Sequence, residues 1–302
     1  MESGNHGQHH EHHHHDFSET ETLGGAFFLN LTFTLIEIAG GLWTNSVAII
    51  ADALHDAGDS LALGLAWYLQ KASGKERDQQ FSYGYGRLSL LAALINGMVL
   101  LVGSFVIIMH VIPRFFASQA VDATGMVWLS LLGIAFNGFA FWRNRSSQSL
   151  NAKMVNWHLL EDVLGWTIVL IGSIIMHFGD YSWLDPLMAL GVTLFILWNV
   201  SKSLGRVIKF FLQSNPEDVD LLAIEEELRL LKNVEDIHDV HAWSLDGKYH
   251  VLSLHVVINH IIDSETLALL KNQIREHTRK MGIDHAPIEV EFPSEACLLE
   301  NC

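Results

Sequence analysis

Six long apolar runs constrain the fold of this chain more than any other feature. They lie at about residues 23–43, 46–69, 88–112, 124–142, 154–178 and 183–201. Each approaches the roughly 20 residues that an α-helix needs to cross a bilayer. The sequence therefore predicts a polytopic α-helical membrane protein, with six spans in a domain at 23–205 and both chain ends on the same side.

Basic residues gather at the connections on one side of these spans. Ten lie there, whereas Arg114 alone flanks the opposite connections. The positive-inside rule then places both termini in the cytoplasm. The short outer loops favour a bacterial cytoplasmic (inner) membrane, and an intracellular vesicle membrane is the alternative. The ten residues are Lys71, Lys75, Arg77, Arg87, Arg143, Arg145, Lys153, Lys202, Arg206 and Lys209.

Composition excludes several other classes of protein. The chain has 34 acidic residues, 18 Lys and Arg, and a net charge of -16. No basic patch stands out, so we expect no nucleic-acid partner. The two cysteines, Cys297 and Cys302, are too few for a disulfide-rich secreted scaffold.

The chain becomes globular in pattern after a linker at 206–215. Residues 217–231 and 264–281 have helical periodicity, and Ser264 is the expected cap of the second helix. Residues 237–245, 248–258 and 287–292 indicate strands. We therefore expect a small cytoplasmic α+β domain of order αββαβ at 216–293, followed by a Cys-containing tail at 294–302.

Ionisable residues inside two of the spans indicate a functional site, because charges in lipid are costly. In the second span Asp52, His55, Asp56 and Asp59 recur at helical spacing and share one face. In the fifth span, His158 and Asp162 are four residues apart.

Facing each other, the pairs His55/Asp59 and His158/Asp162 would offer two nitrogens and two oxygens, a set that suits tetrahedral Zn²⁺. The alternative is a set of helix–helix hydrogen bonds, or a proton relay without metal.

The residues around these pairs resemble the cation diffusion facilitators, a family of bacterial zinc, cadmium and cobalt exporters and eukaryotic vesicular zinc transporters. The resemblance covers about residues 23–293. It rests on the run Ser46–His55 with Asp59, the loop Phe81–Arg87, the run Ala92–Asn96, the pair His158 and Asp162, the dipeptide Asp185-Pro186 and the strand His238–Leu245.

This resemblance implies a homodimeric metal/proton antiporter that binds one Zn²⁺ per protomer at His55, Asp59, His158 and Asp162. Metal ligands must be deprotonated, so protons and metal compete for the same atoms. Asp52 is expected to carry a proton or to orient a ligand, and Asp56 to face water in the access cavity. We expect no enzymatic activity and no catalytic residues.

A second metal site is expected in the cytoplasmic domain. By the same resemblance, His238, His255 and Glu291 would hold a structural or regulatory Zn²⁺. His241 is expected on the opposite face or at the dimer interface, and His250, His260, His277 and His285 in solvent. The His-rich arm at 1–22 reads as a disordered metal-catching segment, and thiol ligation by Cys297 and Cys302 stays open.

Two other functions remain possible at this stage. A membrane metal sensor or buffer would bind at the tail and the arm without transport, although it would need no site within the spans. A proton-coupled transporter of another divalent cation is the other alternative. The donor set favours Zn²⁺, with Cd²⁺, Co²⁺ or Ni²⁺ tolerated, over the more oxygen-seeking Mn²⁺.

Overall fold

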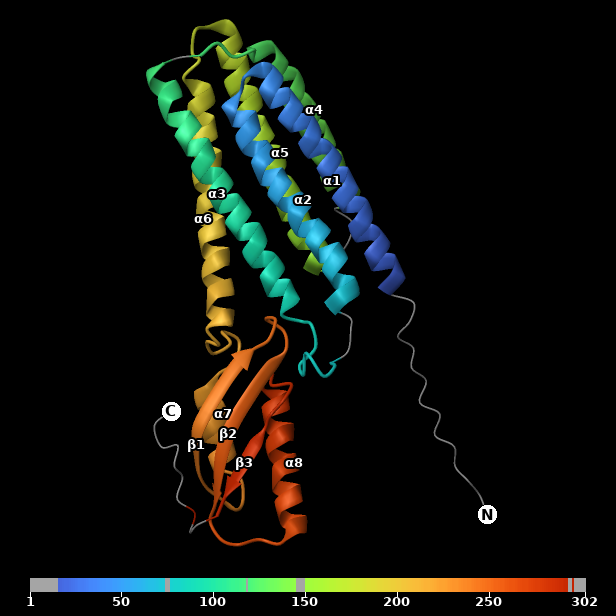
Figure 1. Ribbon diagram of the computed structural model, residues 1–302, viewed down its shortest axis with the longest axis vertical. Helices are drawn as coiled ribbons and strands as arrows, with labels where there is room; N and C mark the ends of the chain where they lie inside the picture. The colour runs from blue at the N-terminus through green and yellow to red at the C-terminus, as the bar shows by residue number, and fades with distance from the viewer. Residues whose placement is uncertain (1–15, 74–76, 118, 145–149, 293–294, 296–302) are drawn as a thin grey trace, which may run out of the picture. The chain divides into compact units, whose positions relative to one another are not determined.

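A computed structural model describes residues 16–73, 77–117, 119–144, 150–292 and 295 of the chain (Figure 1). The chain divides into two compact units. The first holds residues up to 74 together with 92–204, and the second holds 75–91 together with the chain from 205 onward.

Six long helices make up the apolar part of the chain. Five of them are long and apolar enough to cross a membrane. The exception, α2, is 27 residues long, and three aspartates lower its hydropathy. The six helices are α1 (Asp16–Thr44), α2 (Val47–Ser73), α3 (Leu88–Phe116), α4 (Ala123–Asn144), α5 (Leu150–Phe178) and α6 (Leu184–Phe211).

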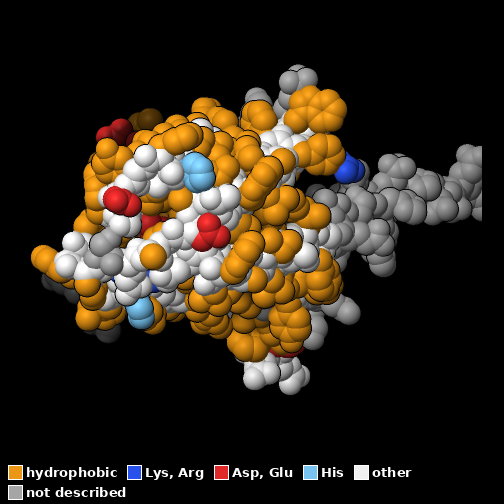
Figure 2. Space-filling model, turned by 90° about the horizontal axis from the view of Figure 1, so that it is seen from above, with side chains coloured by type: hydrophobic (Ala, Val, Ile, Leu, Met, Phe, Trp, Pro, Cys, Tyr) orange, Lys and Arg blue, Asp and Glu red, His pale blue; other side chains and the backbone are white. Residues whose placement is uncertain are grey.

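Large apolar side chains cover the outside of the helical unit, as Figure 2 shows from one end. Phe105, Trp128 and Leu164 are each more than half exposed. Trp43, Trp67, Trp142 and Trp183, near the predicted span ends, are exposed as well. A surface this apolar is expected of helices in lipid, because hydrocarbon solvates such side chains and water does not.

Pairs of helices pack closely inside this unit. The ring of Phe33 on α1 stacks on Phe136 of α4 at a centroid distance of 4.4 Å. Trp166 of α5, which is 1% exposed, lies against α4 at Gly133. A Cβ atom at Gly133 would lie 2.3 Å from the Trp166 ring, so only glycine permits this approach.

The first turn of α2 is capped by a side chain from α6. Asp185 is fully buried and accepts hydrogen bonds from the Ser46 hydroxyl at 2.6 Å, Val47 N–H at 2.9 Å and Ala48 N–H at 3.2 Å. The guanidinium of Arg114, on α3, lies 3.8 Å from the same carboxylate. This contact ties together the ends of three helices and satisfies N–H groups that a helix start leaves unpaired.

The C-terminal domain contains two helices and three strands in the expected order αββαβ. They are α7 (Leu221–Arg229), β1 (Val234–Ser244), β2 (His250–Ile258), α8 (Ser264–Lys280) and β3 (Ile288–Glu291). The sheet order is β1-β2-β3, with β1 antiparallel and β3 parallel to β2. The structure confirms the predicted fold class of a helical membrane protein with a small α+β domain.

Two local predictions in this domain were wrong. The first helix was expected to begin at residue 217. Helix α7 instead begins at Leu221, where the Asp220 side chain accepts a hydrogen bond from Ala223 N–H. The cap of α8 is Asp263, whose carboxylate accepts from Thr266 N–H at 2.7 Å, and Ser264 is already helical. Asp and Ser are both common N-cap residues, so residue type alone did not decide between Asp263 and Ser264.

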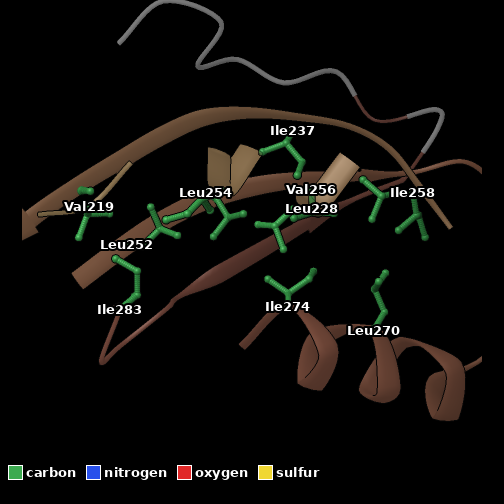
Figure 3. Packing of buried hydrophobic residues seen from close by; sticks show 13 residues of the cluster. Val219, Leu228, Ile237, Leu252, Leu254, Val256, Ile258, Leu270, Ile274 and Ile283 are labelled. Carbon is green, nitrogen blue, oxygen red and sulfur yellow. The ribbon is translucent and has the colours of Figure 1, made fainter. Parts of the chain in front are cut away.

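The hydrophobic core of the domain lies between the sheet and its helices. Figure 3 shows Leu270 and Ile274 directed from α8 toward the sheet, where Leu252, Leu254 and Val256 line one face. Because side chains alternate along a strand, the odd-numbered residues of β2 point to the other face. That face carries His255.

Candidate metal centres

The two His/Asp pairs of α2 and α5 meet in the helical unit. His158 Nε2 lies 3.0 Å from Asp59 Oδ2, and His55 Nε2 lies 3.7 Å from the same oxygen. One donor atom from each of His55, Asp59 and His158 falls within 4.8 Å of the others. Asp162 Oδ2 lies 3.7 Å from His158 Nε2. We name these four residues the membrane cluster.

The membrane cluster follows from helix geometry. Residues four apart on a helix project from the same face, so each helix contributes one imidazole and one carboxylate. The side chains are 24% exposed at His55, 27% at Asp59, 39% at His158 and 12% at Asp162. The side chains are therefore accessible to a cation from solvent, and they offer the nitrogen and oxygen ligands that are typical of Zn²⁺ sites.

Three further carboxylates lie close to the membrane cluster. Asp52 and Asp56 are 9% and 6% exposed, so the expectation that Asp56 faces water was wrong. Asp52 Oδ1 approaches α5 at Gly165, where a Cβ atom would lie 3.9 Å away. Glu37 of α1 is 1% exposed, and its carboxyl group lies beside that of Asp56. Glu161, in contrast, is exposed.

A second group of metal-binding side chains lies on the open face of the C-terminal sheet. His255 Nδ1 is 2.7 Å from Glu291 Oε1, and His238 Nε2 is 3.3 Å from the same oxygen. The side chains of His255 and Glu291 are 6% and 8% exposed. We name His238, His255 and Glu291 the C-terminal cluster. Its two nitrogens and one oxygen converge closely enough to fit a bound Zn²⁺.

Two neighbours of the C-terminal cluster were missed by the sequence analysis. Asp239 Oδ2 and Glu289 Oε2 each lie 3.4 Å from His255 Nε2. Glu289 shares a strand face with Glu291 by simple alternation, so the pattern of β3 already contained that signal. Asp239 could not be found in this way, because its position depends on an irregularity in β1.

The expectation that His241 lies on the sheet face opposite His238 was wrong, as was the expectation for His250. His241 pairs with Ser253 and His238 with His255, so both lie on the same face, and a place for His241 at a dimer interface stays a prediction. His250 is not solvated but 4% exposed, and its Nε2 lies 3.2 Å from Asp218. His260 and His285 are exposed, as expected. The histidines of the N-terminal arm, Cys297 and Cys302 lie outside the described residues.

The chain matches two family models over most of its length. The cation efflux transmembrane domain matches residues 25–205, and the cation efflux protein cytoplasmic domain matches residues 216–291. These two matches, on a helical membrane unit and a small α+β domain, define the class of the protein as a membrane transporter of metal cations. The chain belongs to the cation diffusion facilitator family, and metal cation efflux is the activity of that family.

Curated relatives cover nearly the same part of the chain. The cadmium, cobalt and zinc/H(+)-K(+) antiporter of Bacillus subtilis (strain 168) is 30% identical over 276 residues, which are 88% of this chain and 87% of the relative. The metal cation efflux system protein CzcD of Cupriavidus metallidurans is 30% identical, and the match covers 88% of this chain and 85% of that relative. The zinc transporter ZitB of Escherichia coli (strain K12) is 27% identical, covering 88% and 86%.

Proposed function

We propose that this protein exports Zn²⁺ from the cytoplasm in exchange for protons, by alternating access at the membrane cluster. His55, Asp59, His158 and Asp162 are the ligands of the transported ion. Cd²⁺, Co²⁺ and Ni²⁺ are secondary substrates, since they accept the same nitrogen and oxygen donors. The names of the Bacillus, Cupriavidus and Escherichia relatives support this assignment of metal.

One observation carries the proposal: His55 of α2 and His158 of α5, each four residues from an aspartate on its own helix, both approach Asp59 Oδ2, and Asp162 lies beside His158. Two carboxylates within spans need a compensating cation, because hydrocarbon cannot solvate them. A bound dication provides that compensation. A sensor or buffer would have no need of such a site between membrane helices, so this observation favours transport.

Proton exchange follows from the chemistry of the ligands. Imidazole and carboxylate bind metal only when deprotonated, so an arriving Zn²⁺ displaces protons and arriving protons displace Zn²⁺. When the cluster opens to the cytoplasm, Zn²⁺ binds and releases protons there. When it opens to the other side, protons bind and release Zn²⁺, so each cycle moves one metal ion outward. Asp52 and Asp56, buried beside the cluster on α2, hold protons or orient the ligands in this cycle.

The orientation in the membrane, the oligomeric state and the role of each segment complete the proposal. The excess of basic residues at one set of connections supports cytoplasmic termini, and the bacterial relatives support the inner membrane. The cytoplasmic-domain match supports a homodimer. We assign residues 1–22 to a metal-catching arm, 23–205 to transport, 206–215 to the linker, 216–293 to dimerisation and metal binding, and 294–302 to the tail. Helix α1 already begins at Asp16, within the arm, and α6 continues into the linker as far as Phe211.

The C-terminal cluster favours a further role for zinc as a resident ion. His238, His255 and Glu291 come from three different strands, so an ion bound there would cross-link the sheet. Occupancy would then depend on free zinc in the cytoplasm. The convergence of these three side chains therefore supports metal sensing by the C-terminal domain as a second function beside transport.

Metal flux into proteoliposomes under an imposed pH gradient tests the transport proposal. The wild type is compared with His158→Ala and Asp59→Ala for Zn²⁺, Cd²⁺ and Mn²⁺. Both variants are expected to lose at least about tenfold in Zn²⁺ flux, because a missing ligand weakens the site at least as much as a missing ligand-orienting partner would. Mn²⁺ flux should be low throughout.

Glu161→Gln is the matched control, since Glu161 is exposed and adjoins Asp162 on the same helix. It should keep wild-type flux. Wild-type protein that binds Zn²⁺ but carries no flux under any gradient would refute transport and favour the sensor. Flux that persists when the pH gradient is collapsed and no proton movement accompanies it would refute proton exchange alone.

A further inference from the structure

Strand β1 contains a bulge next to the C-terminal cluster. His238 pairs with His255 and His241 pairs with Ser253, so two residues, Asp239 and Val240, stand opposite the single residue Leu254. Asp239 adopts φ 50°, a left-handed conformation that Asp and Asn tolerate better than most residues. A bulge redirects side chains locally, and here the carboxylate of Asp239 ends only 11% exposed.

The two ring nitrogens of His255 have different carboxylate neighbours. Nδ1 lies 2.7 Å from Glu291 Oε1, within the C-terminal cluster. Nε2 lies 3.4 Å from Asp239 Oδ2. A neutral imidazole that binds a metal through one nitrogen carries its proton on the other, and that N–H needs an acceptor. Asp239 Oδ2 is the largely buried carboxylate oxygen beside this nitrogen, and a small approach from 3.4 Å would make it that acceptor.

We propose that Asp239 is a positioning residue for the C-terminal metal site: it accepts the Nε2 proton of His255 and thereby keeps Nδ1 directed at a divalent cation shared with His238 and Glu291. The inference rests on the proposed C-terminal site and extends it by one functional residue. The other oxygen of Asp239 lies 2.8 Å from His241 Nε2, so the carboxylate is held from both sides.

Glu289 offers a carboxylate at the same distance but in a different environment. Its Oε2 also lies 3.4 Å from His255 Nε2, yet its side chain is 69% exposed. Water screens an exposed charge and competes for its hydrogen bonds, whereas a buried carboxylate interacts more strongly. Asp239 therefore dominates the orientation of His255, and Glu289 contributes little.

The test uses the full-length protein in lipid nanodiscs, with His158→Ala added throughout to disable the membrane cluster. Zinc content and zinc affinity are measured by competition with chelators. The zinc that His255→Ala loses relative to the parent defines the C-terminal site. Asp239→Asn should keep that zinc but bind it about 10- to 100-fold more weakly, the loss usual for a partner that orients a ligand. Glu289→Gln should stay within about threefold of the parent.

A second readout separates positioning from folding. Ring-nitrogen NMR of zinc-bound His255 should show metal at Nδ1 and the proton at Nε2 in the parent, and a mixture of the two ring forms in Asp239→Asn. Asparagine and glycine both adopt the backbone conformation at this position. Asp239→Gly therefore replaces Asp239→Asn if the latter does not fold.

Three results would overturn parts of this account. Unchanged zinc content in His255→Ala would refute the C-terminal site itself. Parental zinc affinity and a single ring form in Asp239→Asn, with that site present, would refute the positioning role alone. An effect of Glu289→Gln as large as that of Asp239→Asn would refute the preference for the buried carboxylate.

Discussion

Replacing Asp185 tests how much of the helical unit's stability depends on one buried carboxylate. This side chain, 0% exposed, accepts from the Ser46 hydroxyl and from the N–H groups of Val47 and Ala48, and Arg114 lies beside it. Ser46 itself accepts from Ile49 N–H at 3.2 Å. The start of α2 is therefore satisfied almost entirely through Asp185 and Ser46.

The size of the effect follows from the donors that would lose their acceptor. Asp185→Ala removes the partner of three buried donors, each of which costs about 1–3 kcal/mol when unsatisfied. Partial repair by relaxation or water reduces the sum, so we expect a loss of about 3–5 kcal/mol in unfolding free energy. Asp185→Asn keeps one acceptor oxygen and should lose about half as much.

Unfolding in mixed micelles, titrated with SDS and followed by tryptophan fluorescence, measures this free energy. Asp180→Asn is the control, because Asp180 is an exposed acid close by in the chain, and it should change stability by less than about 0.5 kcal/mol. If Asp185→Ala costs less than about 1 kcal/mol, the carboxylate is not the principal cap of α2 and the reasoning fails.

The remaining predictions concern helix packing, bound zinc and one helix cap. Gly133→Ala should destabilise the helical unit by about 1–3 kcal/mol, since its new methyl group would meet Trp166 at 2.3 Å; Gly138→Ala, on the same helix with nothing within 4 Å, should not, and equal SDS-unfolding curves would refute the contact. Chelating zinc should lower the melting temperature of the C-terminal domain in the wild type but not in His255→Ala, with zinc at 100 times its Kd contributing about 2.7 kcal/mol; equal shifts would exclude an ion at this cluster. Thr266 N–H holds the pKa of Asp263 below its usual value. The contribution of this cap is therefore complete above the ordinary pKa of about 4 and is lost as pH falls through the lower folded-state pKa. Asp263→Asn should remove this part of the acid sensitivity in circular-dichroism melts, and an unchanged pH profile would contradict it.

The parts of the fold that depend on local pattern could be predicted from the sequence. Apolar runs of span length predicted six helices, even though the aspartates of α2 weaken its signal, and alternation predicted the three strands of the C-terminal sheet. The i, i+4 spacing placed His55 with Asp59 and His158 with Asp162 on single helix faces. The meeting of these two faces, seen in the 3.0 Å approach of His158 to Asp59, was inferred from chemistry rather than from pattern.

The features that could not be predicted depend on contacts between distant residues or on backbone irregularities. The bulge at Asp239 changes which face His241 occupies, and no propensity of this segment indicates it. The burial of His250 beside Asp218, 32 residues away, depends on how α7 packs. Similarly, Asp56 was expected in water because it is charged, whereas its burial is set by the surrounding helices.

The cap of α2 also has a consequence for how the protein is assembled. Asp185 and Ser46 are separated by 139 residues, and four complete helices, α2 to α5, lie between them. Helices enter a membrane in the order of their synthesis and associate afterwards. The second helix must therefore wait, with its first N–H groups unpaired, until the sixth has arrived. Chains truncated before the sixth helix should be less stable and more readily degraded, because Asp185, which caps the second helix, belongs to the sixth.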